Sequence, residues 1–433
     1  MDRLDGPALR PGQPAAVTVV GKQLQGSVAL WTPVGTLRPK ADADLSKDQP
    51  VAFEGSLAAE AVPGIYPVRL VTSHGVSEAA WTIVDDLPFT AITAEADNRT
   101  TGQPLSLPCC VNGSTAAVAS RTFKLTLAVG QVFAAEIFAR RLGSDLDPVL
   151  RLTGPDGKEL VWSDDFPGLE GDCQFRFEAP VAGEYRLELR DVRYSGGARH
   201  FFHLRLARMP LTAAALPRIA AVGKPVSITD AGGSVIGEAT PPATPAEDLL
   251  AVSFRAADAE ASSIAAVAVT SSPVLPETEP NSTREQATEV PADVGVLSGT
   301  FQSPGDADWF RVNAAAAGPL LVLARTRDVG SPCDLILEIH KEDGSKLAES
   351  DDAGPRDAEL SVQLPAPGNY FLKVSELAGR GGPEWCYALN VFHTRPAVIA
   401  TAPADRLNIP RGGSASLPLS LRRFQTSGPL LVE

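Results

Sequence analysis

The sequence is poor in cysteine, methionine and aromatic residues: 433 residues include five cysteines, two methionines and 6% aromatic residues. Small secreted domains that depend on disulfides are much richer in cysteine, so the cores here must be held mainly by apolar packing. Neither a CxxC pair nor a Cys/His spacing suited to zinc occurs among the cysteines, which are Cys109, Cys110, Cys173, Cys333 and Cys386. Because five is an odd number, the cysteines cannot all form disulfides within the chain. Cysteine usage alone therefore does not indicate whether the protein resides in a reducing or an oxidising compartment.

Long apolar runs and clusters of basic residues are also missing. The longest nearly apolar run, 314–324, is interrupted by Gly318 and Pro319 and is far shorter than the ~20 residues that span a bilayer. The formal net charge is −14, with acidic residues spread along the chain. Nucleic acid demands a basic surface, so we expect no nucleic-acid partner. The shortness of the apolar runs predicts no membrane span in this chain. The carboxylates remain available for cations.

Signatures of common enzymes are absent as well. There is no Gly-x-Ser-x-Gly elbow, no His-Glu-x-x-His helix, no Walker loop and no dinucleotide-binding glycine fingerprint. His200 and His203 lie three residues apart on an expected strand and so point to opposite faces. We predict that the chain is not an enzyme, has no catalytic residues and requires no cofactor, and that its histidines are structural or surface residues.

Glycine and proline are abundant, with 37 of each, and they punctuate the chain at short intervals. Such punctuation favours short strands and turns over long helices. A length of 433 residues suggests three to five domains of roughly 100–200 residues each. We therefore predict an all-β fold, a multidomain string of β-sandwich modules.

A long-range repeat is the most informative feature of the sequence. DPVLRLTGPDGKELVWSDD, which begins at Asp147, matches DLILEIHKEDGSKLAESDD, which begins at Asp334, at an offset of 187 residues. The offset of 187 also relates Phe123 to Phe310. After a two-residue deletion the offset is 185, and it relates Tyr185 to Tyr370. Two copies of one domain are therefore predicted, at 95–208 and 277–393.

Each copy carries local signals of antiparallel strands. The dipeptide Asp156-Gly157 separates two short apolar runs, as a tight hairpin requires. Tyr185, Leu187 and Leu189 alternate with charged residues, the pattern of a strand with one buried face. We expect the aromatic pairs of the repeat to be core residues of two sandwiches of about 110 residues each.

The second copy contains an ordered set of short motifs: Glu-Thr-Glu-Pro-Asn at 277–281, Gly-Asp-Ala-Asp-Trp-Phe at 305–310, Asp-Gly at 343–344, Ser-Asp-Asp at 350–352 and Pro-Gly-Asn-Tyr at 367–370. In this order they resemble the bacterial pre-peptidase C-terminal domain, a jelly-roll-like β-sandwich appended to secreted proteases and to large exported proteins. The first copy departs from the family at its start, where Glu95-Ala96-Asp97-Asn98 replaces Glu-Pro-Asn. At the position of the Gly-Asp-Ala-Asp motif, Ala119 and Arg121 of the first copy stand where the second copy has Asp306 and Asp308.

The remaining segments also read as short strands joined by Gly/Pro turns. Residues 1–90 resemble the Ig-like modules that precede such domains in large planctomycete-type exported proteins, and 209–272 resemble a smaller module of that kind. Residues 394–433 form an incomplete β module, since about 40 residues are too few for an independent sandwich core. The resemblance implies an extracytoplasmic location. No signal peptide is visible in residues 1–12, so we interpret the chain as a segment of a longer protein or as a gene product that has lost its ends.

A candidate calcium site comes from the second copy. Calcium prefers six to eight oxygen ligands gathered from loops. The resemblance to collagen-binding modules of clostridial collagenases, in which a Glu-rich linker and a Gly-Asp-x-Asp loop bind calcium, implies the ligands Glu277, Glu279, Asn281, Asp306 and Asp308. The alternative is an acidic linker beside a loop capped by hydrogen bonds from aspartate to the backbone. The acidic pairs Asp164-Asp165 and Asp351-Asp352 are expected to form turn hydrogen bonds rather than a catalytic pair.

Two functions follow from the sequence. The first is a non-catalytic structural or interaction segment that spaces or presents domains of an exported bacterial protein and binds an extracellular partner, a protein or a polysaccharide. The second is a set of modules that target a separate catalytic domain to a polysaccharide or protein polymer. An exposed aromatic platform would favour the second, and Trp162 and Trp385 are the candidates for it.

Overall fold

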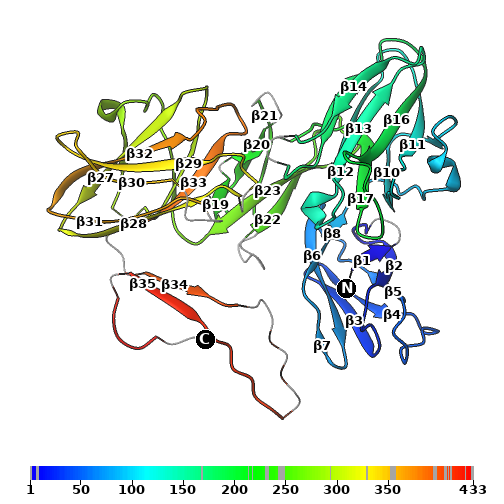
Figure 1. The fold of residues 1–433 in the computed structure, drawn as a ribbon, viewed down its shortest axis with the longest axis horizontal. Coiled ribbons are helices and arrows are strands. Elements are labelled where there is room, and N and C mark those ends of the chain that lie inside the picture. Colours follow the sequence, from blue (N-terminus) through cyan, green and yellow to red (C-terminus); the bar gives the residue numbers. More distant parts are fainter. Residues whose placement is uncertain are drawn as a thin grey trace. The chain divides into compact units, whose positions relative to one another are not determined.

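A computed structural model describes residues 2–5, 9–166, 169–212, 214–216, 218–229, 234–241, 249–292, 294–327, 330–351, 357–393, 397–403, 407, 409, 412–424 and 426–430. The all-β prediction is confirmed. Helical structure in these ranges consists of short 3-10 turns, such as η1 (Ala94–Asp97), η2 (Arg140–Leu142) and η3 (Arg284–Gln286). The chain divides into two compact units, 1–212 with 251–265 and 213–250 with 266–433 (Figure 1).

The N-terminal module is one eight-stranded antiparallel sheet with the order β1-β2-β5-β4-β3-β6-β7, and β8 pairs with β6. Its strands are β1 (Arg3–Asp5), β2 (Pro14–Val20), β3 (Ser27–Thr32), β4 (Gly35–Pro39), β5 (Val51–Ser56), β6 (Gly64–Thr72), β7 (Gly75–Val76) and β8 (Ala80–Val84). Alternate residues of β2 are buried, and Val17 and Val19 pack with Phe53 in the core. This burial of one strand face gives the module its own core.

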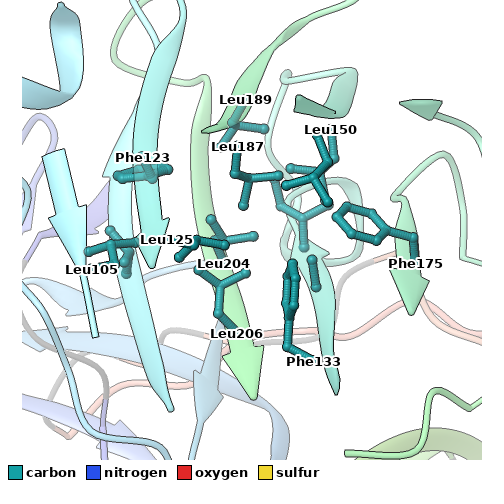
Figure 2. Close-up of a cluster of buried hydrophobic side chains, with 14 of the residues drawn as sticks. Leu105, Phe123, Leu125, Phe133, Leu150, Phe175, Leu187, Leu189, Leu204 and Leu206 are labelled. Carbon is teal, nitrogen blue, oxygen red and sulfur yellow. The ribbon is translucent and has the colours of Figure 1, made fainter. Parts of the chain in front are cut away.

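The first sandwich consists of a four-stranded sheet, β10-β17-β12-β15, and a five-stranded sheet, β14-β13-β16-β11-β9. Its strands are β9 (Gln103–Leu105), β10 (Cys109–Ser114), β11 (Arg121–Leu127), β12 (Val132–Phe138), β13 (Pro148–Thr153), β14 (Glu159–Ser163), β15 (Gln174–Glu178), β16 (Gly183–Asp191) and β17 (Phe201–Ala207). Figure 2 shows the core between the sheets, where Phe123 of one sheet and Phe133 of the other lie among leucines.

The second sandwich has the same strand order. One sheet is β24-β26-β33-β28-β31 and the other is β25-β27-β32-β29-β30. Its strands are β24 (Val274–Pro276), β25 (Thr288–Val290), β26 (Val296–Thr300), β27 (Ala307–Ala314), β28 (Gly318–Arg325), β29 (Leu335–Lys341), β30 (Lys346–Ser350), β31 (Glu359–Leu364), β32 (Gly368–Glu376) and β33 (Cys386–Phe392). β24 is an additional edge strand that pairs in parallel with β26.

Strand register corresponds between the two sandwiches as well as strand order. Phe123 lies opposite Leu187 in the pair β11/β16, and Phe310 lies opposite Leu372 in the pair β27/β32. The hairpins β13/β14 and β29/β30 turn at Gly157 and Gly344, whose φ angles are +80° and +86°. Only glycine adopts such angles readily, which is why Asp-Gly occurs at both turns.

The remaining strands lie between the sandwiches and after the second one. They are β18 (Ala214–Leu216), β19 (Ile219–Ala221), β20 (Val226–Thr229), β21 (Val235–Ala239), β22 (Leu249–Phe254), β23 (Ser263–Thr270), β34 (Ala397–Thr401) and β35 (Ser420–Phe424). β18, β20 and β21 form one small sheet, and β34 pairs with β35. Most of the Ala/Pro-rich stretch 239–246 lies outside the described residues. All five cysteines are free and buried.

Three tyrosines share one local arrangement. Each follows a glycine by two residues, and its hydroxyl donates to the carbonyl oxygen four residues upstream: Tyr66 to Val62 (2.7 Å), Tyr185 to Val181 (2.6 Å) and Tyr370 to Ala366 (2.8 Å). Tyr185 and Tyr370 are buried in their cores, as are Phe123 and Phe310, so the core prediction for both aromatic pairs is confirmed. The rings fill the cores while the hydroxyls fix the turn at which each strand begins.

We expect Tyr185→Ala to lower the stability of the first sandwich by about 3–5 kcal/mol, because it leaves a cavity in a closely packed core. Tyr185→Phe keeps the ring and removes one hydrogen bond, so it should cost about 1 kcal/mol. Native-state hydrogen exchange of the β16 amides measures both changes. The β32 amides serve as the internal control, and unchanged exchange of β16 in Tyr185→Ala would contradict the core assignment.

Candidate functional site

An acidic cluster lies at one end of the second sandwich. The carboxylates of Glu277, Glu279 and Asp308 each place an oxygen within 4.8 Å of the others. Asp308 is on β27, on the same face as Phe310, and is fully buried. Glu277 directly follows β24, so the parallel pairing of β24 with β26 brings it to this end of the sheet.

Close packing holds this cluster together. The Tyr387 hydroxyl donates to Asp308 Oδ2 (2.7 Å), and the Thr300 backbone N–H donates to Glu277 Oε1 (2.7 Å). A Cβ on Gly299 would lie 2.3 Å from Tyr387 Oη and 2.5 Å from Glu277 Oε2, so only glycine fits there. Burial, and then repulsion between the two carboxylates, raises the pKa of Asp308, and burial raises that of Glu277.

The residues present fit a hard cation. Asn281 Oδ1 and Asp308 Oδ1 are buried and have no hydrogen-bond partner among the described residues. Buried oxygens without a donor are costly, and a cation that accepted them as ligands would remove that cost. With Glu277 and Glu279 they make a set of four oxygen-bearing side chains from two segments. When bound, calcium would neutralise the carboxylates and tie residues 277–281 to β27.

Asp306 has a different role from the other four predicted ligands. Its Oδ1 accepts hydrogen bonds from Ser282 Oγ (3.2 Å) and the Ala307 N–H (2.9 Å), and its Oδ2 accepts one from the Gln302 N–H (2.9 Å). These bonds cap the loop before β27. The structure therefore gathers Glu277, Glu279, Asn281 and Asp308, and uses Asp306 for the loop.

The first sandwich has an arginine where the second has this cluster. Arg121 occupies the β11 position that matches Asp308, and its guanidinium pairs with Asp97 and donates from Nε to the Ser114 carbonyl (2.9 Å). Phe202 stands where the second sandwich has Tyr387. A guanidinium already bonded to a carboxylate would repel a cation at this position.

A second buried polar cluster lies on the outer face of the first sandwich. Arg205 on β17 is completely buried and donates to both oxygens of Asp85, from Nε to Oδ2 (2.9 Å) and from Nη2 to Oδ1 (3.2 Å). Its Nη1 donates to Glu136 Oε2 on β12 (2.9 Å), and its Nη2 also donates to the Ser262 carbonyl (2.6 Å). We call these four residues the Arg205 network.

The network holds charge out of contact with water. Burial alone raises the pKa of Asp85, but the Arg205 charge and the hydrogen bonds from His203 and Arg205 outweigh it and hold the pKa far below its ordinary value. Burial also opposes the charge of Arg205, yet Asp85 and Glu136 together raise its pKa. Both groups therefore stay ionised inside the protein.

Asp85, Cys110 and His203 also lie within metal-ligand distance of one another. They do not fit a metal, however. His203 Nε2 is 2.7 Å from Asp85 Oδ2 and its Nδ1 is 2.5 Å from Asn112 Oδ1, so both ring nitrogens are engaged. The Arg205 charge occupies the remaining space beside Asp85 and would repel a cation. His203 is a structural residue, as predicted.

Exposed aromatic residues gather beside β14 and β16 of the first sandwich. The side chains of Trp162 and Tyr194 have exposed fractions of 45% and 39%. The guanidinium carbon of Arg190 lies 5.0 Å from the Trp162 ring centroid and 4.5 Å from that of Tyr194. Trp385, the other candidate for a platform, packs against the core of the second sandwich.

The acidic pairs do not form a catalytic arrangement in the described part of the chain. Asp164 Oδ2 accepts a hydrogen bond from Trp162 Nε1 (3.4 Å), and Asp165 lies just beyond β14 with a φ of +30°. In the second pair, Asp352 lies outside the described residues.

Sequence reasoning missed the Arg205 network and the part played by Tyr194. Asp85 and Arg205 are separated by 120 residues, and nothing in either neighbourhood indicates the other. One signal was available: β17 reads Phe-Phe-His-Leu-Arg-Leu-Ala, and its polar residues alternate with apolar ones that face a core. A histidine and an arginine on one strand face could have suggested a covered polar layer.

Comparison with known proteins gives partial matches. No family model matches the chain. A probable subtilase-type serine protease of Deinococcus radiodurans is 36% identical over 100 residues, which are 22% of this chain and 14% of the protease. This chain therefore spans about one seventh of that relative's length.

Two solved structures illustrate the structural likenesses. The pre-peptidase C-terminal domain of a Bacillus anthracis collagenase matches over 24% of this chain and 93% of that domain, with 11% identity and a TM-score of 0.20. The SGBP-B protein of the Bacteroides ovatus mixed-linkage glucan utilization locus, solved with a mixed-linkage heptasaccharide, matches over 85% of this chain and 71% of that one, with 11% identity and a TM-score of 0.17. Among the described residues, no helix has the length and apolar character needed to cross a bilayer.

We expect Arg205→Met to destabilise the first unit by about 3–5 kcal/mol, because it leaves the Asp85 carboxylate buried without its partner. Asp85 has a depressed pKa in the folded state, so its ionised form stabilises the fold. This contribution to the free energy of unfolding is fully present above the ordinary carboxyl pKa of about 4. It is lost progressively as the pH falls below about 4. Hydrogen exchange of the β17 amides at neutral and acidic pH measures both effects.

The matched control for this prediction is Arg199→Met. Arg199 pairs with Asp145 on the surface, where an ion pair contributes only about 0–1 kcal/mol. Equal exchange rates in the two variants would contradict the central role of Arg205.

Proposed function

We propose that this chain is a non-catalytic segment of an exported bacterial protein, in which β-sandwich modules space and present other domains. The Arg205 network carries the proposal. Asp85 directly follows β8, the last strand of the N-terminal module, and it is bonded to β17 of the first sandwich. The link between these two modules is therefore buried and charged instead of free, which suits a rigid spacer.

Further observations support the same proposal. The buried histidine, His203, is bonded through both ring nitrogens, to Asp85 and to Asn112, so it is not free to act as a base. The motifs of the two sandwiches resemble the pre-peptidase C-terminal domain, a module appended to secreted proteases. The partial sequence match to a subtilase-type protease supports an accessory role beside a catalytic domain and an extracytoplasmic location.

A second function, the targeting of an attached enzyme to a polysaccharide, is favoured by a separate observation. Trp162 and Tyr194 present exposed rings on the first sandwich. Isolated exposed aromatics are ordinary, but two rings fixed by a common arginine form a defined surface.

We further propose that calcium binds the cluster of Glu277, Glu279, Asn281 and Asp308 and stabilises the second sandwich. The orphaned oxygens of Asn281 and Asp308 support this. The rival interpretation is that Glu277 and Asp308 share a proton, which would explain their proximity without a metal.

Calorimetric titration of the full chain should show one calcium site per chain, with a Kd of about 0.1–1 mM as in other extracellular modules. Asp308→Asn should abolish the heat of binding, because it removes a charged ligand. Arg121→Gln, the matched change in the first sandwich, should leave the titration unaltered. Absence of calcium binding would favour the shared proton, and binding that persists in Asp308→Asn would place the site elsewhere.

The rigid-spacer proposal can be tested by a distance measurement. Spin labels on Glu54→Cys in the N-terminal module and Thr126→Cys in the first sandwich report the distance between modules, and the native cysteines are all buried. We expect one narrow distance distribution, which Arg205→Met should broaden. A broad distribution in the parent chain would contradict the proposal. Turnover of peptide or polysaccharide substrates by the purified chain would contradict the non-catalytic role.

A further inference from the structure

Each sandwich has a pair of loops at one end that are joined by a backbone hydrogen bond. The two sandwiches have different residues at the bonded positions, and this difference points to binding in the first sandwich. In the second sandwich, Gly305 and Gly379 have φ angles of +84° and +65°, and the Gly305 N–H donates to the Gly379 carbonyl (3.0 Å). In the first sandwich, Val118 and Tyr194 hold the matching positions with φ angles of +58° and +57°, and the Val118 N–H donates to the Tyr194 carbonyl (2.9 Å). The backbone is the same, but the residues are not.

This substitution of glycine by bulky residues is unfavourable for the fold. Glycine adopts positive φ freely, whereas a β-branched or aromatic residue is strained there. Burial does not compensate, because the side chain of Val118 is 80% exposed and that of Tyr194 is 39% exposed. Strained residues of this kind concentrate at sites of function.

Tyr194 belongs to a fixed stack of side chains. The Arg190 guanidinium lies over both the Tyr194 and the Trp162 ring, and Arg190 itself is only 8% exposed. Its Nη1 donates to the carbonyl oxygens of Asp191 (2.9 Å) and Val192 (3.2 Å). Because the arginine is anchored to the backbone, both rings are held in place before any ligand arrives. The second sandwich has Ser375 and Glu349 at the positions of Arg190 and Trp162, so it has no such stack.

Two guanidinium groups, those of Arg99 and Arg190, lie close to the Tyr194 ring. The guanidinium carbon of Arg99 lies 5.8 Å from its centroid, and Arg193 is the adjacent residue. Arg99, Arg190 and Arg193 make no ion pair within the ranges that the structure describes. Guanidinium groups without a carboxylate partner favour an anionic ligand, and their planar donors match a carboxylate. Asp164 lies at the Trp162 end, where it accepts the indole N–H. The Asp191 carboxylate accepts the backbone N–H groups of Arg193 and Ser195, and Asp147 is close enough to Arg193 to feel its charge.

We propose that the first sandwich binds an acidic polysaccharide across Trp162 and Tyr194. The sugar rings stack on the exposed aromatic faces, and uronic-acid carboxylates pair with Arg99 and Arg193. The Arg190 stack positions the rings, and the strained backbone at Tyr194 keeps its ring turned outward. This inference rests on the second proposed function, polymer targeting, and names the ligand class and the site.

The test uses the full chain and an oligogalacturonate, with its fully methyl-esterified form as the neutral reference. Binding is measured by calorimetry in calcium-free buffer. We expect the acidic oligomer to bind at least about tenfold more tightly than the ester at low salt, because exposed charges attract most strongly there. The double variant Arg99→Gln, Arg193→Gln should remove this preference.

The variant Tyr194→Gly separates binding from folding. It installs the residue that the second sandwich has at this position, so it should relieve strain and preserve the loop while it weakens binding about tenfold or more. Trp162→Ala should weaken binding to a similar extent. Trp31→Ala is the matched control, because Trp31 is an equally exposed tryptophan on the N-terminal module, with an exposed fraction of 40%.

The outcomes distinguish the site from the function. If the chain binds the oligomer but Tyr194→Gly and Trp162→Ala bind equally well, the site is refuted and polymer targeting stands. If the ester binds as tightly as the acid, the acidic ligand class is refuted. If the chain binds neither form, the site is overturned and polymer targeting loses its support. Binding of gelatin in place of both sugars would replace the polysaccharide by a protein ligand.

Discussion

A guanidinium that is fully removed from water is the constraint on which the first unit depends. Arg205 could not be buried without compensation, since an isolated charge in a protein interior costs several kcal/mol. The carboxylates of Asp85 and Glu136 provide that compensation from the N-terminal module and from β12. The network adds a charged contact to the apolar one that Ile83 of β8 makes with Phe138 of β12, so the N-terminal module and the first sandwich are joined by both kinds of interaction.

The two sandwiches show how one scaffold can be used differently at its loop end. Strand order and register are shared, so the two sandwiches can be compared position by position. Where the second sandwich gathers carboxylates around Asp308, the first pairs Arg121 with Asp97. Where the second places Gly379, the first places Tyr194 on the same backbone. These exchanges leave the aromatic core pairs Phe123/Phe310 and Tyr185/Tyr370 in place.

The elements that could be predicted from the sequence are those set by local patterns. The Asp156-Gly157 turn and the alternation around Tyr185 report directly on neighbouring residues, so the hairpin and the buried strand face were correctly predicted. The sequence predicted the residues of the cluster at Glu277. Their spacing could not show that the Asp306 carboxylate would accept hydrogen bonds from the backbone of its own loop. The Arg205 network was not foreseen because it depends on which module covers the outer face of β17. The positive φ of Tyr194 was equally hidden, since it is visible only beside the equivalent glycine.

The burial of all five cysteines has a consequence for the chemistry that the chain can survive. A thiol reacts with oxidants chiefly as the thiolate, and burial raises the pKa of Cys109 to about 11 and that of Cys333 to about 12. At neutral pH very few Cys109 and Cys333 thiols are ionised, and all five cysteines are buried. Cys109 and Cys333 therefore resist sulfenylation and mixed-disulfide exchange in the folded protein even though they are unpaired. The low reactivity of these thiols results from their burial, so it is lost when the sandwiches unfold.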